Sequence, residues 1–118
     1  MPHFRVDDMF HGHPKAREAG LAAIGLWTLA GSHSMAYKLD GAVPQYFIDG
    51  FKREGEKAAE SLARVGLWLP NANGYHFHDW LDWQPSAEEI EKDRERQRLR
   101  SREFRRRLRE GKKGSDDK

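Results

Sequence analysis

The sequence predicts an α+β fold that is mostly α-helical and continues into a basic helix. Apolar residues recur at helical spacing between residues 14 and 66, which predicts several helices. A turn-rich stretch at 70–74 separates two short runs of apolar and aromatic residues, which predicts a β-hairpin. Nearly all apolar residues lie before residue 85, so the core belongs to that part of the chain.

The composition indicates where the hydrophobic core lies in the chain and in which cell compartment the protein is expected. Apolar residues make up 37% of the 118 residues and charged residues 34%, so the core must be concentrated in one part of the chain. Cysteine is absent, which excludes disulfides and thiolate zinc sites. We expect neither a signal peptide nor a membrane span, because the apolar run at 21–30 is shorter than the roughly 20 residues that a span needs. The expected location is the bacterial cytoplasm.

Charge divides the chain into two parts. Residues 1–85 hold 8 Lys and Arg against 10 Asp and Glu, whereas residues 94–113 hold 11 against 3. A folded, slightly acidic body is therefore followed by a basic segment. We expect a domain over 1–85, an arginine-rich helix over 86–110 and a disordered tail over 111–118.

Proline and glycine mark the ends of the first elements. Apolar residues spaced by polar ones over 4–10 predict a short strand. Pro14 suits the first position of a helix, and residues 21–29 are apolar on all sides, as in a helix at the centre of a domain. We expect glycine and serine at 31–32 to end or loosen this helix, and Asp40-Gly41 to form a turn.

Two helices separated by a short connection come next. Residues 44–51 form a short amphipathic segment, and the polar residues at 52–55 suit a tight connection. Over 56–66 the apolar residues return at helical spacing and Gly66 fits a C-cap, which predicts a second helix.

A hairpin follows this helix pair. Strands are expected at 67–69 and 75–78, on either side of the turn at 70–74. Ser86 and Glu89 then match a capping box, which predicts the start of the basic helix. Two helices joined by a short turn and followed by a hairpin make a winged helix-turn-helix, with the wing at 70–74.

The residues also resemble a known family. The matching stretches are VDDMFHGHPKAREAGLAAIGLWTLAGS, DGAVP, GLW and FHDWLDWQPS, which together span roughly residues 5–86. They resemble the N-terminal winged-helix domain of phage replication initiators, also called replisome organisers, in the DnaD-like forms of actinobacterial phages and prophages. The resemblance implies a DNA-binding protein of phage origin that acts in replication initiation. Such initiators usually carry a further domain after a basic linker, so we expect this chain to supply the DNA-binding module.

In a helix-turn-helix the second helix enters the major groove and presents polar side chains to base edges. The residues in those places are Lys57, Ser61 and Arg64 on the helix, with Lys52 and Arg53 in the connection before it. Residues 52–64 hold 4 basic and 3 acidic residues, which is a weak electrostatic footprint. Whether this helix reads bases is therefore open, and an ordinary surface helix or a protein-binding helix is the alternative.

The basic segment gives a stronger signal. Its arginines repeat at spacings of three and four, which places one set on a single helical face: Arg94, Arg98, Arg102, Arg105, Arg106 and Arg109. We expect Arg96, Arg100 and Arg107 to flank this face, and Glu103 and Glu95 to pair with Arg107 and Arg98. We expect a partly formed helix that becomes more ordered on phosphates, because guanidinium groups bind them through paired hydrogen bonds.

Two other groups of residues carry weaker indications. His11, His13, His76 and His78 could form a histidine metal site if a first strand met the hairpin, but packing and hydrogen bonding are favoured and we expect no metal. The four tryptophans could stack on bases; Trp27 and Trp68 are expected in the core, and Trp80 and Trp83 packed against the domain.

The sequence contains no nucleophile–base motif and no phosphate-binding loop, so we expect neither an enzyme nor a cofactor. Duplex DNA is the favoured partner over a single strand, and transcription control is the lesser alternative to replication. A solvated charged helix without a partner is the first alternative for the basic segment, and RNA or an acidic protein surface is the second. The alternative function is an interaction protein that contacts a replisome, transcription or host protein through helix 56–66 and the aromatic segment 79–83. An oligomer is compatible with the sequence.

Overall fold

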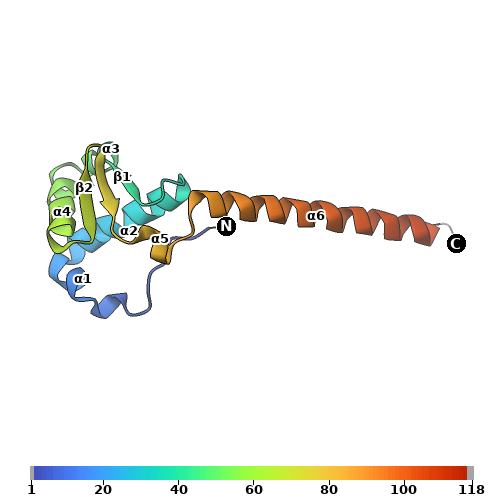
Figure 1. Ribbon diagram of the computed structural model, residues 1–118, viewed down its shortest axis with the longest axis horizontal. Helices are drawn as coiled ribbons and strands as arrows, with labels where there is room; N and C mark the ends of the chain where they lie inside the picture. The colour runs from blue at the N-terminus through green and yellow to red at the C-terminus, as the bar shows by residue number, and fades with distance from the viewer. Residues whose placement is uncertain (1, 117–118) are drawn as a thin grey trace. The chain divides into compact units, whose positions relative to one another are not determined.

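The computed structural model describes residues 2–116, and the side chains of residues 2–111. The fold is α+β and mostly helical, with a small antiparallel sheet (Figure 1). The chain forms two compact units that divide between Ser86 and Ala87. The first unit contains η1 (Phe10–Gly12), α1 (Pro14–Ala19), α2 (Leu21–Ala36), β1 (Ala42–Pro44), α3 (Gln45–Asp49), α4 (Lys52–Val65), β2 (Trp68–Asn71), β3 (Gly74–Phe77) and α5 (Trp80–Trp83). The second is the single helix α6 (Ala87–Asp116).

The sheet has the strand order β1-β3-β2, and both pairs are antiparallel. β2 and β3 form the predicted hairpin, in which Asn71 and Gly74 face each other across the two-residue turn Ala72-Asn73. β1 was not predicted from the sequence. It pairs with β3 so that Val43 lies opposite Tyr75, and three residues are too few to show an alternating pattern.

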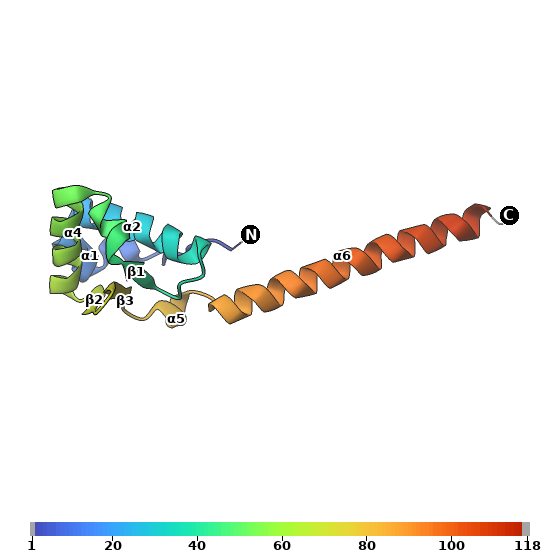
Figure 2. The ribbon, with the colours of Figure 1, turned by 90° about the horizontal axis from the view of Figure 1, so that it is seen from above.

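The core lies between the sheet and the helices α2 and α4, which pack against each other on one side of it (Figure 2). The largest fully buried apolar side chains come from β1, α3, α4 and β2: Val43, Ile48, Leu62 and Trp68. The amphipathic pattern of 56–66 thus corresponds to a real core-facing side of α4.

No strand forms over 4–10, so that prediction is wrong. The backbone of Arg5 is held instead by the side chain of Gln84: the Arg5 amide donates to Oε1 at 2.9 Å, and Nε2 donates to the Arg5 carbonyl at 2.7 Å. Phe4 packs its ring against Trp27 and Phe77. Phe4 therefore packs against core residues, whereas Val6 is exposed, and a glutamine takes the place of the partner strand.

Helix α1 begins as predicted. Pro14 occupies its first turn, and the preceding His13 caps it by accepting the Lys15 amide on Nδ1 at 3.2 Å. The helical segment breaks at Gly20, whose φ of +91° ends α1 before α2 starts. Only one side of α2 is buried, because Leu21 is 93% exposed and Leu29 50%. Within residues 2–116, no helix combines the length and apolar character needed to cross a membrane.

The expected helix end at 31–32 is also wrong, since α2 continues to Ala36. Gly31 is buried, and a Cβ at this position would overlap the ring of Phe4. Here the glycine makes room for a close contact and does not terminate the helix. The turn at Asp40-Gly41 is confirmed, and the buried Ser34 hydroxyl accepts the Gly41 amide at 2.8 Å.

The start of α4 and the end of α6 need correction. α4 begins at Lys52, so the expected connection at 52–55 is its first turn and the linker is only Gly50 and Phe51. Gly66 caps α4 in the left-handed conformation, as predicted. α6 starts directly after Ser86, as predicted, but continues through 111–116. Those residues were expected in a disordered tail; 117–118 lie outside the described residues.

We predict that Gly31→Val lowers the free energy of unfolding by about 1–3 kcal/mol, because the new side chain would displace the Phe4 ring from a packed core. Gly25 lies in the same helix with open space around its Cα. Gly25→Ala should therefore raise stability by about 0.5–1 kcal/mol through helix propensity. Urea unfolding of both variants checks the pair, and a Gly31→Val protein as stable as the parent would contradict the proposed packing.

Candidate nucleic-acid interface

Helix α4 presents a partly cationic outward face. Ala58, Ala59 and Leu62 are buried against the core, which fixes the opposite side toward solvent. At roughly 100° per residue, Arg53, Lys57 and Arg64 lie within about 40° of one another on that side. All three are exposed. The structure thus gathers three of the predicted contact residues on one surface.

Acidic residues reduce the positive charge of this outward face of α4. Glu60 lies on the same side of α4 as Lys57, and Glu54 and Glu56 lie beside it. None of these carboxylates forms an ion pair with a described side chain. The half-buried Ser61 donates its hydroxyl to the Lys57 carbonyl at 3.2 Å, so that donor is already engaged. The outward face of α4 is therefore close to neutral, as the sequence indicated.

Lys52 has an unusual backbone conformation. Its φ is +57°, although it is the first residue of α4. This left-handed conformation costs a residue with a Cβ about 1–2 kcal/mol, whereas glycine adopts it without strain. Lys38, Asp40 and Asp79 also have a positive φ, so the backbone conformation does not single out the Lys52 side chain.

Helix α6 carries the strongest charge pattern. The predicted arginine stripe, Arg94, Arg98, Arg102, Arg105, Arg106 and Arg109, falls within an arc of roughly 120° around the helix. Every member is exposed. The stripe is interrupted by acids only near its ends: Arg94 lies 3.8 Å from Glu91, and Arg106 lies 3.9 Å from Glu110. Its other arginines have no acidic partner among the described side chains.

The other arginines of α6 do not flank this stripe, as we expected them to. Arg96, Arg100 and Arg107 point to the opposite side of the helix, because their spacing from the stripe is not three or four residues. Arg96 pairs with Asp93 at 3.2 Å, and Arg107 pairs with Glu103 at 3.1 Å, as predicted. The expected pair between Glu95 and Arg98 does not form. Acidic partners are therefore found for two of the three arginines on this side of α6, but for only two of the six in the stripe.

The four histidines take separate structural roles. His11 contacts the Asp8 carbonyl at 3.0 Å, and His13 caps α1. His76 lies between two carbonyl oxygens, those of Phe77 and Asp40. Across the described residues, no three His, Cys, Asp or Glu side chains gather as a metal site would require.

The tryptophans divide into core and surface residues. Trp27 and Trp68 are buried, as predicted, and so is Trp80. Trp83 is 57% exposed but also lines a pocket of the first unit, so the expectation that it packs against the domain is confirmed only in part. The α5 turn thus buries one indole and leaves more than half of the other exposed.

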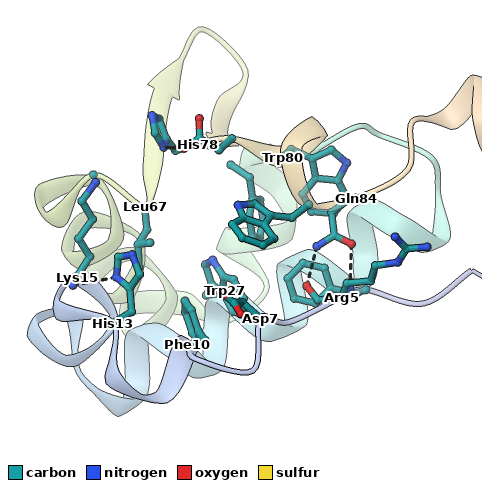
Figure 3. Close-up of a pocket in the computed structure, with 15 residues that line it drawn as sticks. Arg5, Asp7, Phe10, His13, Lys15, Trp27, Leu67, His78, Trp80 and Gln84 are labelled. Carbon is teal, nitrogen blue, oxygen red and sulfur yellow. Dashed lines mark hydrogen bonds and ion pairs between the residues drawn. The ribbon is translucent and has the colours of Figure 1, made fainter.

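A pocket of about 170 Å³ lies in the first unit and was missed by the sequence analysis (Figure 3). Its apolar lining includes Phe10, Trp27 and Phe77, and its polar lining includes His13 and Lys15. These residues come from segments separated by up to about 70 positions, so no local pattern could reveal them. Most of the lining residues lie in the stretches quoted for the family resemblance. Those stretches were the one feature of the sequence that could have drawn attention to the pocket.

No protein-family model, curated protein or solved structure matches the chain.

We predict that Lys52→Gly raises the free energy of unfolding by about 1 kcal/mol, because glycine adopts the observed φ without strain. Lys52→Gln removes the same charge but keeps a Cβ, so it should leave stability unchanged. Thermal unfolding of the two variants separates backbone strain from charge. Equal stability of both variants would show that the lysine backbone is not strained.

Proposed function

We propose that this chain is a DNA-binding winged-helix protein in which α6 supplies most of the affinity. The order of α2, β1, α3, α4, β2 and β3 supports this proposal, since a helix-turn-helix followed by a hairpin has that order. In this assignment α3 and α4 are the helix pair, and the turn Ala72-Asn73 is the tip of the wing. The outward cations of α4, Arg53, Lys57 and Arg64, then lie where such proteins meet DNA.

The single observation that carries the proposal is the unpaired part of the α6 stripe. Arg98, Arg102, Arg105 and Arg109 form a row of exposed guanidinium groups with no acidic partner among the described side chains. Cations that lack partners repel one another along a helix, and an array of phosphates removes that repulsion. Guanidinium groups also bind phosphate oxygens through two parallel hydrogen bonds.

The process served is proposed from the resemblance to phage replication initiators. A winged helix next to a phosphate-binding helix suits a protein that must hold duplex DNA at an origin. Backbone contacts hold a protein on DNA without reading sequence, whereas base contacts select the site. α6 is assigned the first role, and α4 is the element available for the second.

We predict that the full chain binds random duplex DNA and that its affinity falls roughly 1,000-fold between 50 and 200 mM salt, if about six phosphates are contacted. The triple variant R98Q/R102Q/R105Q should reduce the slope of log affinity against log salt by about 3. The matched variant R96Q/R100Q/R107Q removes the same charge from the partly paired side and should reduce it by about 1. Fluorescence anisotropy at several salt concentrations measures both.

Two results would contradict the proposal. Equal losses from the two triple variants would show that only net charge matters and that the stripe is not a binding face. Absence of binding by the full chain at 50 mM salt would remove the nucleic-acid function altogether.

A second candidate function, an interaction protein, rests on the exposed residues of α5. Leu81 is 65% exposed and Trp83 57%, and together they place apolar surface next to the buried Trp80. Aromatic residues of this kind are enriched at protein interfaces. The glutamates of α4 also favour a protein partner over DNA. This function replaces the first if the full chain fails to bind DNA at low salt.

A further inference from the structure

The aromatic pocket of the first unit has a size and a wall chemistry that the DNA-binding proposal does not use. Its volume is about 170 Å³, and an apolar cavity of about 150 Å³ holds one benzene ring. Phe10 and Trp27 stack nearly parallel there, with ring centroids 4.4 Å apart and planes inclined by 14°. A single aromatic ring is therefore the group that this space accommodates.

On one side of the pocket, the side chains of His13 and Lys15 can donate hydrogen bonds to a ligand. His13 accepts the Lys15 amide on Nδ1, so the neutral imidazole carries its proton on Nε2. The Lys15 side chain reaches Gly66 at the C-cap of α4, and its ammonium forms no ion pair with a described side chain. Figure 3 shows Lys15 and His13 together on the side of the pocket away from Trp80 and Gln84.

The acidic residues of the lining leave these donors free. The Asp79 carboxylate is paired with the His78 imidazole at 2.8 Å, and not with Lys15 or His13. Asp7 accepts the Met9 amide at 3.2 Å, and in Figure 3 it lies beyond Phe10 from His13. A ligand carboxylate beside Lys15 would thus meet a cation and a neutral donor.

The pocket also lies apart from the hairpin turn, which is the tip of the proposed wing. Leu67 precedes β2 and His78 follows β3, so the pocket is at the end of the hairpin opposite the turn Ala72-Asn73. Gly66, at the C-terminal end of α4, lies on its rim. A ligand can occupy this space while the hairpin turn stays free.

We propose that this pocket binds an aromatic group that carries a carboxylate, with the ring against the aromatic wall and the carboxylate at Lys15 and His13. Two sources offer that chemistry: a small aromatic acid, or the C-terminal aromatic residue of a peptide. The ring supplies apolar contact and the carboxylate fixes its direction, as in small-molecule sites that combine apolar walls with a few placed polar groups.

The test titrates the full chain with 3-phenylpropionate and with its uncharged amide by isothermal calorimetry. The acid should bind about tenfold more tightly than the amide, because only the acid forms a charge-assisted hydrogen bond with Lys15. Lys15→Gln should remove that difference. Lys57→Gln, which deletes the same charge from the outward face of α4, should preserve it.

Further arms identify the source and guard against a structural role of Lys15. A short peptide that ends in phenylalanine is compared with the free acid. If the peptide binds more tightly, and its C-terminally amidated form does not, the natural ligand is a peptide chain end. If the free acid binds more tightly, the natural ligand is a small molecule. No binding of the acid at millimolar concentration overturns the proposal, as does equal binding of acid and amide. It is also overturned if Lys15→Gln lowers thermal stability but leaves the acid's affinity unchanged.

Discussion

The ring of Phe4 lies against the backbone of α2 at Gly31, where a Cβ would occupy the same space. Its centroid is 4.9 Å from that of Trp27, 5.8 Å from Phe77 and 5.7 Å from Trp80. These three rings come from α2, β3 and α5, so one side chain near the N-terminus joins three elements that are remote in sequence. The Arg5 amide donates to Gln84 Oε1 and Gln84 Nε2 donates to the Arg5 carbonyl, and these two bonds hold the backbone next to Phe4 in place. Since Phe4, Trp27 and Phe77 also line the pocket, the same contact shapes the ligand site.

The orientation of α4 depends on a second set of close contacts. Gly55, Ala58 and Ala59 form its buried side together with Leu62, and such small side chains allow helices to approach closely. A Cβ at Gly55 would meet the Ile48 carbonyl oxygen of α3, so the two helices are joined with little freedom between them. The backbone positions that carry the cations of α4 are therefore held firmly relative to α3. For an interface that places side chains against a rigid duplex, this rigidity reduces the ordering cost of binding.

The sequence predicted the elements whose signals are local. The amphipathic period of α4, the proline at the start of α1 and the hairpin turn each depend on neighbouring residues. β1 was missed and the N-terminal segment was wrongly predicted to be a strand, because each is defined by a distant partner: β3 in one case and Gln84 in the other. Gly31 was misinterpreted for the same reason, since its role is set by Phe4 and not by helix propensity. The arginine stripe followed from spacing alone, whereas the pocket required the tertiary fold to bring its walls together.

The charges of the two units separate affinity from selectivity in the proposed DNA complex. The unpaired arginines of α6 are exposed and repeat along one side of a regular helix, which suits phosphates and offers no distinction between bases. On α4, the carboxylate of Glu60 beside Lys57 opposes general attraction to a polyanion, so contact there is favourable only where specific hydrogen bonds compensate for it. Salt should therefore act mainly on the contribution of α6, and base sequence only on that of α4. A protein arranged in this way holds any duplex through one element and distinguishes sites through the other.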